Sequence, residues 1–425
     1  MKGLKAGKTV SKPMRIMRDL ENKRPLIFLL ILMFPGFGCK ESGSDETSQG
    51  GAQEGEIGPS DPKAQYQLAV RYLGGRRRDK DITKAVKWLN LAADQGIVQA
   101  QYDLARLHLE GDEIVKNIPV AAEWFRKAAE QGDARAQHDF ATIHLYGDGV
   151  TKNPKDAEKW FRKAAEQGDA NSRFELGNLL FALNDGGEND YDEAEKWLRL
   201  AAEQNHAGAQ CNLAIIYDLG ILEKDGKPLG RDPVEAAKWF LRSAEQGGSS
   251  AQRSIGDCYR VGDGVKRDQV EAVRWYRKSA EQGNSDGERA LARAYLKGSG
   301  VRKNVDEAIK WFKKSAAHGG THAQYLLGVH YLEGDEIPKD SAEAITFLLK
   351  AAKGGHPQAQ LRLATCYLEG LGTPEDSVVS YMWSDIALRL GEEDAKELRH
   401  KAERKMSPYF IKKAQRLSKE WKPER

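Results

Sequence analysis

Four arginines in the second half of the chain have the side chains with the clearest potential for chemistry. Arg253 and Arg289 stand 36 residues apart, and Arg260 and Arg293 each follow one of them closely. A guanidinium is a planar fork that can bind a carboxylate through two parallel hydrogen bonds. The pattern therefore indicates a site for acidic groups. The alternative is a solvated, neutralised face, which rests on three acidic neighbours: Asp257, Asp286 and Glu288.

Short motifs that resemble enzyme signatures occur without the context that their chemistry requires. The glycine pairs at 147–149, 262–264 and 298–300 resemble half of a phosphate-binding loop, but each follows a predicted helix and lacks the third glycine. Ser60 and Lys63 have the serine–x–x–lysine spacing of penicillin-recognising enzymes, but no partner motif is present. We therefore predict a chain that is not an enzyme, with no catalytic residue and no cofactor.

Histidine and cysteine patterns predict neither a metal site nor a disulfide framework. His318 and His322 are four residues apart, a spacing that suits two metal ligands on one helix face, but two glycines between them interrupt the helix. Four cysteines in 425 residues cannot form a disulfide scaffold. Cys258 and Cys366 occupy equivalent places three sequence units apart, which is too far for a disulfide bond.

The composition excludes several classes of protein. The chain has 425 residues, of which 30% are charged, and a net charge of +3. Its negative mean hydropathy excludes a protein with many membrane spans. Residues 1–38 hold eight basic and two acidic residues, so the remainder holds 58 basic and 61 acidic residues and carries −3. Because the body of the chain has no basic surplus, we expect no nucleic-acid partner.

The first 38 residues have the features of an export signal. A basic stretch precedes nine apolar residues at 26–34, a run too short to cross a hydrocarbon core about 30 Å thick. The segment Gly36–Cys39 resembles a bacterial lipoprotein cleavage box, which makes Cys39 the predicted lipidation site. Ordinary cleavage, a retained signal anchor, or an incidental apolar stretch in a cytoplasmic protein are alternatives. Met14 or Met17 could be the true initiator.

The body of the chain, from residue 63, is one unit repeated nine times with a period of 36. Each unit predicts two helices: the first ends near a glycine, and the second begins at an Asp or Asn that can cap its free N–H groups. One such hairpin cannot bury its apolar face alone, so the units must stack. The predicted caps are Asp81, Asn117, Asn153, Asp190, Asp232, Asp268, Asn304, Asp340 and Asp376.

Three segments depart from the repeated pattern. Residues 39–62 are rich in Gly, Ser, Glu and Gln and are predicted to form a disordered tether. Residues 221–231 are an extra loop in the fifth unit, for which a specific role and simple tolerance of an insertion are both open. Residues 395–425 have fewer small residues and many charges, and we predict that they form two helices that cap the last apolar face.

The repeated unit is similar to that of a known family. The stretch AQYDLARLHLEGDEIVKNIPVAAEWFRKAAEQGDA at 100–134, and its counterparts at 136–170 and 251–283, resemble the Sel-one-like repeat (SLR) family, a relative of the tetratricopeptide repeats. The resemblance covers residues 63–421. It implies an all-α fold, a right-handed α-solenoid of nine helix-turn-helix repeats at 63–394. It also implies binding to other molecules, without naming one partner.

The resemblance further implies which residues face a partner. In this family the first helices line a concave groove, so the third and seventh residues of each unit are expected to point into it. Aromatic side chains then flank the arginines of units six and seven, and such residues often anchor interfaces. We expect an acidic peptide or an anionic polysaccharide in this groove. The implied groove residues are Tyr102, Phe174, Arg253, Arg260, Arg289, Arg293 and Tyr325.

Together these features predict a non-catalytic scaffold that binds partner proteins at the bacterial cell envelope. We expect a monomeric, exported lipoprotein that faces the periplasm from the outer rather than the inner membrane, or that lies at the cell surface. Its membrane contact is then the N-terminal lipid or signal anchor. An envelope hydrolase and a cytoplasmic or host-directed adaptor are the alternatives.

Overall fold

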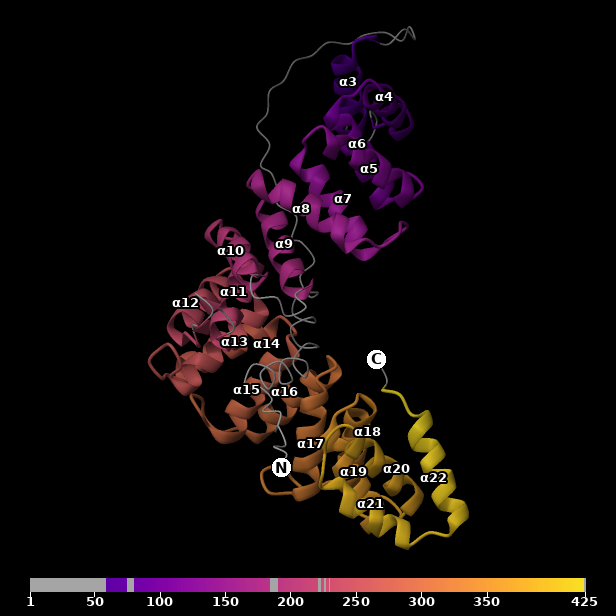
Figure 1. Cartoon of the computed structure of the whole chain (residues 1–425). Coiled ribbons are helices and arrows are strands. Elements are labelled where there is room, and N and C mark those ends of the chain that lie inside the picture. The colour runs from indigo at the N-terminus through magenta and orange to yellow at the C-terminus, as the bar shows by residue number, and fades with distance from the viewer. Residues whose placement is uncertain are drawn as a thin grey trace, which may run out of the picture. The chain divides into compact units, whose positions relative to one another are not determined.

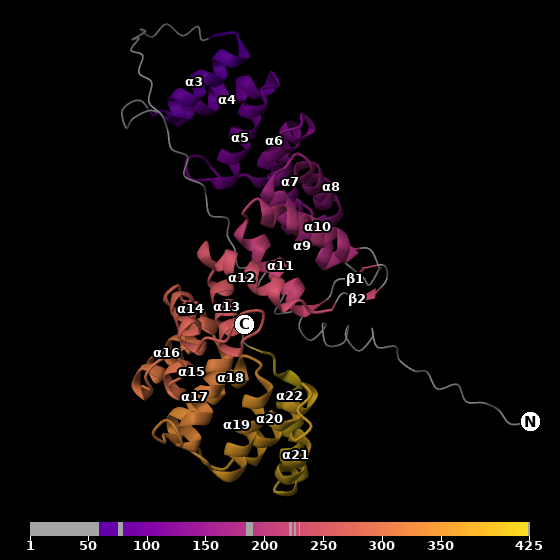
Figure 2. The same cartoon turned by 90° about the vertical axis from the view of Figure 1, so that its left-hand side faces the viewer.

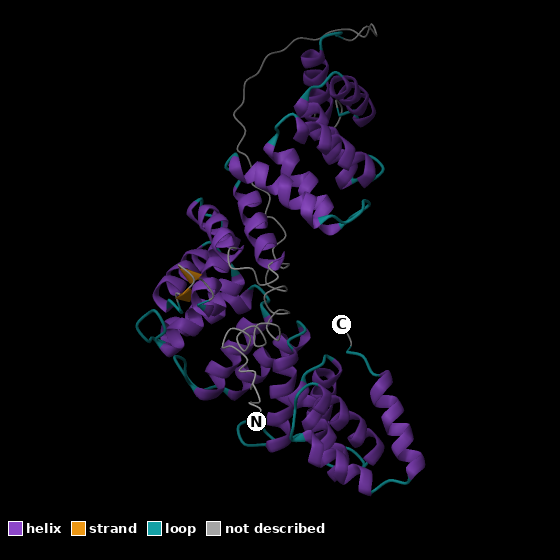
Figure 3. Cartoon of the chain, in the orientation of Figure 1, coloured by secondary structure: helices purple, strands orange, loops and turns teal. Residues whose placement is uncertain are grey.

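A computed structural model describes residues 59–74, 80–183, 190–220, 223–224, 227–228 and 230–423. Most of these residues are helical (Figure 3). The predicted signal segment, Cys39 and the tether up to residue 58 lie outside the described residues. The chain divides into two compact units, Met1–Arg231 and Asp232–Arg425.

The first unit consists of helices that alternate between the first and second helix of successive repeats, and consecutive helices lie against each other (Figures 1 and 2). Its described helices are α3 (Pro62–Gly74), α4 (Ile82–Asp94), α5 (Val98–Glu110), α6 (Ile118–Glu130), α7 (Ala134–Tyr146), α8 (Pro154–Glu166), α9 (Ala170–Leu183), α10 (Asp190–Glu203) and α11 (Ala207–Leu219).

The second unit continues the alternation and ends with two helices that pack against α20. Its described helices are α12 (Pro233–Glu245), α13 (Ser249–Val261), α14 (Gln269–Glu281), α15 (Ser285–Lys297), α16 (Val305–Ala317), α17 (Thr321–Glu333), α18 (Ser341–Lys353), α19 (Pro357–Glu369), α20 (Ser377–Arg389), α21 (Ala395–Arg404) and α22 (Pro408–Glu420). The last two helices, α21 and α22, occupy the segment that we predicted to form a capping pair.

The second helices begin where the sequence placed their caps. In eight repeats the Asp or Asn side chain accepts a hydrogen bond from a backbone N–H in the first turn, as Asp232 Oδ1 does from Glu235 N at 3.0 Å. Each such bond satisfies a donor that a helix start leaves free and contributes about 1 kcal/mol. The fourth repeat differs, because α10 includes Asp190 as its first helical residue.

Residues with a left-handed backbone conformation (positive φ) follow the ends of the helices. Gly111 and Gly262, which follow first helices, have φ of 73° and 83°. A residue with a Cβ would lose about 1–2 kcal/mol in this conformation. The second helices are likewise followed by glycine, with one exception. Asn205 has φ of 69° and is the only non-glycine with positive φ in the described part of the chain. The prediction that first helices end near a glycine is confirmed at Gly111 and Gly262.

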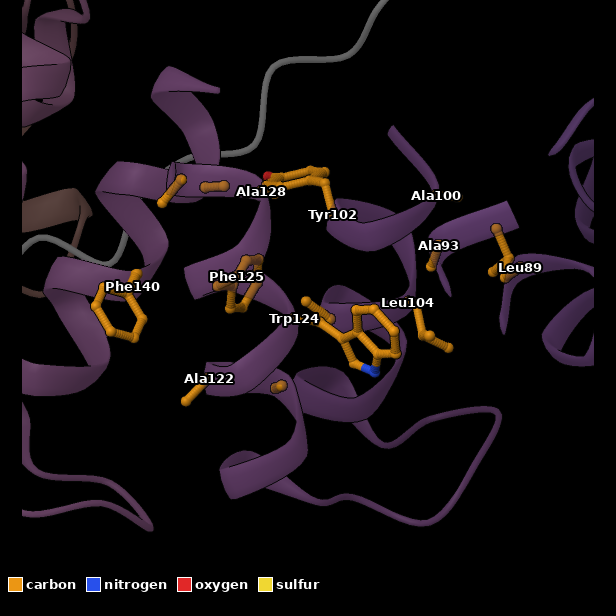
Figure 4. Packing of buried hydrophobic residues seen from close by; sticks show 14 of the residues in the cluster. Leu89, Ala93, Ala100, Tyr102, Leu104, Ala122, Trp124, Phe125, Ala128 and Phe140 are labelled. Atoms are coloured by element: carbon orange, nitrogen blue, oxygen red, sulfur yellow. The ribbon is translucent and has the colours of Figure 1, made fainter. Parts of the chain in front are cut away.

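The core combines fully buried alanines with large side chains that fill the remaining space (Figure 4). Ala100 and Ala128 have no exposed surface, which lets neighbouring helices approach closely, and Phe125 beside them is also fully buried. Trp124 is 9% exposed, and the Nζ atom of Lys127 lies 3.8 Å from its ring centroid. Burial of such an aromatic side chain contributes about 1.5–3 kcal/mol. The indole of Trp124 therefore belongs to the core of this repeat.

A buried glutamine on the first helix ties successive repeats together. Gln101 Nε2 donates to the backbone O of Ala93, at the end of the preceding repeat, at 3.0 Å. Gln101 Oε1 accepts from Gln131 Nε2, at the end of its own repeat, at 2.8 Å. We call this pair of bonds the glutamine clamp. The same two bonds form at Gln137 and at Gln252. Each contributes about 1 kcal/mol net and costs more if left unmade.

One short strand pair interrupts the helical fold. Two-residue strands β1 (Glu223–Lys224) and β2 (Lys227–Pro228) pair antiparallel within the extra loop of the fifth repeat (Figure 3). The predicted all-α class is otherwise confirmed across the described ranges. The loop at 221–231 is thus an addition to the repeat that leaves its two helices intact.

Candidate binding pocket in repeats six and seven

A pocket of about 840 Å³ lies between α13, α14, α15 and the turn after α15. Residues four and seven apart on α13, and four and eight apart on α15, line it because such spacings bring side chains to one face of a helix. The helical lining includes Arg253, Asp257 and Arg260 from α13 with Arg289, Arg293 and Lys297 from α15. The structure therefore brings the four arginines singled out from the sequence into one pocket.

Positive charge dominates the pocket wall. Six cationic side chains face one carboxylate, that of Asp257. Arg267, Arg293 and Lys297 have no ion-pair partner within the described part of the chain, and all three are exposed. These three cations are therefore available to an incoming anion. The six cations are Arg253, Arg260, Arg267, Arg289, Arg293 and Lys297.

Asp257 holds two of the arginines at the pocket wall. Arg253 Nε lies 3.3 Å from Asp257 Oδ2, and Arg260 Nε lies 3.3 Å from Asp257 Oδ1. The hydroxyl of Tyr276 donates to Asp257 Oδ1 at 2.7 Å. Burial, and then the charge of Asp257, raise the pKa of Tyr276 far above its usual range, so this hydroxyl stays a donor. Because such half-exposed ion pairs contribute only about 0.2–1 kcal/mol, an external carboxylate can replace them.

Asp286 supports Arg289 from beside the pocket. Arg289 Nη2 lies 2.8 Å from Asp286 Oδ1. Burial opposes ionisation of Asp286, but the hydrogen bond and charge of Arg289 outweigh it and lower the pKa of this carboxyl. Glu288, the third acidic neighbour in the sequence, is 1% exposed and lies against His318 instead. The neutralised-face alternative thus applies to Arg253, Arg260 and Arg289, and not to Arg293.

Tyr325 lies on α17 and is not part of the pocket lining. Its ring stacks on His356, with 4.6 Å between centroids and 21° between planes. His322 lies beside this pair of rings: its Nδ1 lies 3.1 Å from His356 Nε2. Burial, and then the charges of Arg289 and Arg293, lower the pKa of His322.

Tyr102 and Phe174 do not present the open aromatic faces that we expected. They belong to the first unit and are only 9% and 6% exposed. The guanidinium carbon of Arg135 lies 4.3 Å from the centroid of the Tyr102 ring, and the ring of Phe174 lies 4.5 Å from that of His206. The repeat register gives the direction in which a side chain leaves its helix. It does not show that Arg135 of the next repeat covers Tyr102, or that His206 at the end of the same repeat covers Phe174.

Among the pocket residues that the sequence interpretation missed, three carry cationic or hydroxyl side chains. Lys297 lies on the same face of α15 as Arg289 and Arg293, and Arg267 precedes α14. Tyr276 lies on α14, the second helix of its repeat, and we did not expect second helices at the binding face. A signal existed for Tyr276: it stands where the third and fifth repeats carry Phe161 and Phe240 after the tryptophan, so its hydroxyl is the unusual feature. Arg267 gave no comparable signal, because it sits in a loop of charged residues.

One group in the first unit imitates a hydrolytic triad without its geometry. His138 Nδ1 lies 2.9 Å from Ser172 Oγ and 3.8 Å from Asp169 Oδ2. A triad needs the serine and the carboxylate on opposite imidazole nitrogens, whereas here both lie at Nδ1. Ser172 is also fully buried. This group therefore ties neighbouring repeats together, and it offers no accessible nucleophile.

Histidine and cysteine side chains are dispersed in the described ranges. His318 and His322 do not converge, since they pair with Glu288 and His356 respectively. No three metal-ligating side chains gather in the described residues. Cys211, Cys258 and Cys366 form no disulfide bond within the described residues, and burial raises the pKa of Cys366 to about 11. Within the same ranges, no helix is both long and apolar enough to cross a bilayer.

Comparison with known proteins places the repeats in a family. The Sel1 repeat family model matches nine consecutive segments, at 62–97, 98–133, 134–169, 170–206, 207–248, 249–284, 285–320, 321–356 and 357–392. The chain is therefore an α-solenoid of nine tandem repeats. No curated protein matches the sequence.

Two solved structures illustrate the relationship. A protective antigen of uropathogenic Escherichia coli strains with an SLR fold is 30% identical over 85% of this chain and 92% of its own, with a TM-score of 0.48. A Sel1 repeat protein from Oxalobacter formigenes is 29% identical over 86% and 97%, with a TM-score of 0.59. Sel1 repeat proteins are generally scaffolds for protein interactions and typically non-catalytic. On nine consecutive matches, this chain belongs to the Sel1 repeat family.

Proposed function

We propose that the chain is a non-catalytic, monomeric scaffold of the bacterial cell envelope that docks a partner protein through an acidic segment held in the pocket of repeats six and seven. The charge of the pocket carries the proposal. Six cations face one carboxylate, and three of the cations have no ion-pair partner in the described residues. A concave site lined by one sign of charge attracts the opposite charge and selects among partners.

The arrangement of the cations favours carboxylates. Five of the six are arginines, whose forked guanidinium groups bind carboxylates in pairs of hydrogen bonds. The two stripes on α13 and α15 run along neighbouring first helices, so an extended acidic segment can meet both. Ala290, Ala294 and the turn at Gly298 and Gly300 leave room beside them. A volume of about 840 Å³ accommodates a few side chains and excludes a folded domain.

Binding of an acidic peptide to the full chain tests this site. We would follow a fluorescent glutamate-rich peptide by anisotropy, and compare the parent with the variant Arg293→Glu/Lys297→Glu. Both residues are exposed and lack ion-pair partners in the described residues, so the variant should fold normally. Loss of two charge-assisted contacts should weaken binding at least tenfold, since each contributes about 1.5–3 kcal/mol.

A matched control separates the pocket from net charge. Lys155→Glu/Lys339→Glu makes the same change in charge at exposed positions outside the pocket. It should bind the peptide like the parent at moderate salt. Equal losses in both variants would show that only net charge matters. If polygalacturonate binds in the pocket and the peptide does not, the ligand is an anionic polysaccharide and the protein partner is wrong.

The envelope location rests on the N-terminal segment, whose apolar run and Cys39 have the pattern of an exported lipoprotein. A multiply acylated cysteine would anchor the chain firmly, whereas one acyl chain binds weakly. Cell fractionation with mass spectrometry of the mature N-terminus tests this. We expect an acylated Cys39 in the outer-membrane fraction, and a Cys39→Ser chain outside it. An intact N-terminus recovered from the cytoplasm would leave the cytoplasmic adaptor as the better explanation.

A further inference from the structure

The last helix, α22, has one face held against the repeats and one face turned to solvent. Ala414 and Ser418 are fully buried, and Ser418 Oγ donates to Asp385 Oδ2 at 2.5 Å. Arg389 Nη2 donates to Ser418 Oγ at 2.8 Å. The ring of Trp421 meets that of Trp383 at 5.9 Å. These contacts fix the rotation of α22 about its own axis. Its opposite face is therefore exposed to solvent.

The presented face combines aromatic and basic side chains. Tyr409, Lys412, Lys413 and Arg416 follow the i, i+3, i+4, i+7 spacing that brings residues to one side of a helix. Tyr409 is 74% exposed and Phe410 is 45% exposed, and their rings touch edge to face at 5.4 Å. We call this surface the basic face of α22. Its members are Tyr409, Phe410, Lys412, Lys413, Arg416 and Lys419.

Charge on this face is largely uncompensated. Residues 395–423 hold ten basic and three acidic side chains, a net charge of +7 in a chain whose total is +3. Lys412, Lys413 and Lys419 have no ion-pair partner in the part of the chain that the structure describes. Arg416 has one, Glu420, at 3.9 Å. Solvation alone explains exposed lysines, but it does not explain two adjacent exposed aromatic rings among them.

We propose that the basic face of α22 docks on an anionic lipid bilayer. Aromatic side chains favour the boundary between water and hydrocarbon, and lysines beside them are attracted to negatively charged head groups. The contact would be a second one, separate from the predicted N-terminal anchor and from the pocket of repeats six and seven. It would hold the C-terminal end of the repeats at the membrane surface.

The shape of the surface favours a bilayer over a nucleic acid. Proteins that bind single strands usually combine stacking residues with a charged groove that follows the backbone. Here the face is one convex helix, and three of its four cations are lysines, which serve as point charges rather than as forks for phosphate. A broad, diffuse negative surface needs no groove and no fixed hydrogen-bond geometry.

Vesicle flotation of the full chain tests the proposal. We would use a Cys39→Ser background, so that no acyl chain contributes, with vesicles of phosphatidylcholine alone or mixed with phosphatidylglycerol. The parent should bind the mixed vesicles at least tenfold more tightly. Lys412→Glu/Lys413→Glu/Lys419→Glu should abolish that preference, and Tyr409→Ser/Phe410→Ser should weaken binding to the mixed vesicles severalfold. All five positions are exposed, so the fold should be retained.

Two controls make the result specific. Lys116→Glu/Lys155→Glu/Lys339→Glu makes the same change in charge at exposed positions elsewhere and should float like the parent. Arg293→Glu/Lys297→Glu should also float like the parent, so that failure here and failure of the pocket are distinguishable. Equal flotation of the parent and the α22 charge variant would overturn the proposal. So would binding of single-stranded DNA through α22 without binding of vesicles.

Discussion

His318 Nδ1 lies 2.9 Å from Glu288 Oε2, at the place where other repeats carry the glutamine clamp. Glu288 takes the position of Gln252, and His318 that of Gln282, whose side chains are joined at 2.8 Å in the preceding repeat. Glu288 is 1% exposed, whereas half of the His318 side chain is exposed. The seventh repeat therefore closes with a carboxyl–imidazole pair where its neighbour closes with two amides.

Replacing this pair by amides should be tolerated, and breaking it should not. His318→Ala leaves a buried carboxylate without its partner, so the free energy of unfolding should fall by about 1–2 kcal/mol. Glu288→Gln/His318→Gln recreates the glutamine clamp and should unfold within about 0.5 kcal/mol of the parent. Urea unfolding of the two single glutamine variants and the double variant measures the coupling. Strictly additive effects would show that the two side chains do not interact.

Two glycines with positive φ should differ sharply in their tolerance of alanine. Gly264 has φ of +70°, and a Cβ there would lie 1.8 Å from the backbone O of Pro233. Gly247 has φ of +96° with nothing within 4 Å of such a Cβ. Gly247→Ala should cost only the conformational strain, about 1–2 kcal/mol. Gly264→Ala should cost clearly more because backbone must move. Similar melting temperatures for both variants would contradict this close approach.

Glu175 should destabilise the first unit at neutral and alkaline pH. Burial raises its pKa from 4.5 to about 7, so the folded state binds more protons than the unfolded state in that interval. Stability from this group is present at low pH and is lost as pH rises through 7. Glu175→Gln should therefore raise the free energy of unfolding at pH 8 by about 1–3 kcal/mol, and have less effect near pH 5.

An exposed glutamate on the preceding helix provides the control for the Glu175→Gln variant. Glu166 is exposed, so Glu166→Gln should leave the pH profile unchanged. Urea unfolding followed at several pH values between about 5 and 8 covers the interval over which Glu175 titrates. A Glu175→Gln chain with the same pH profile as the parent would mean that this carboxyl is solvated.

His356 should act in the opposite direction in the second unit. Burial, and then the charge of His322, lower its pKa from 6.5 to about 4. The unfolded state therefore binds more protons between these values, so stability rises with pH in this window and falls on acidification. His356→Asn retains a capping side chain for α19 but cannot titrate. It should lose less stability between pH 7 and 5 than the parent, as melting temperatures would show. An equal loss would assign the acid sensitivity elsewhere.

Local signals made most of the fold predictable. Helix starts at Asp232 and stops at Gly262 or Asn205 depend on hydrogen bonds and backbone angles within a few residues, and these are legible in sequence. The clustering of Arg253 and Arg289 followed from their equal positions in adjacent repeats. What could not be read was contact between distant residues. Gln101 looks like an ordinary polar residue until its partners, 8 and 30 residues away, are known.

The burial of Tyr102 shows the same limit for the candidate site. Its place in the repeat resembles that of Arg253, but Tyr102 lies under Arg135, whereas Arg253 lines a pocket. The difference comes from neighbouring side chains, which a periodic pattern does not specify. Tyr276 was missed for a related reason: the family resemblance placed the groove on the first helices, whereas Tyr276 lies on a second helix, α14.

The glutamine clamp also bears on how the chain can change length. In each clamp one bond reaches the end of the preceding repeat, and the other stays within its own repeat. Excising or duplicating a whole module of 36 residues would therefore rejoin every glutamine to an equivalent acceptor. Removal of a single helix would instead leave the side-chain amide of a clamp glutamine without one of its hydrogen-bond partners. Recombination between modules can thus alter the number of repeats while each junction closed by a glutamine clamp keeps its existing hydrogen bonds.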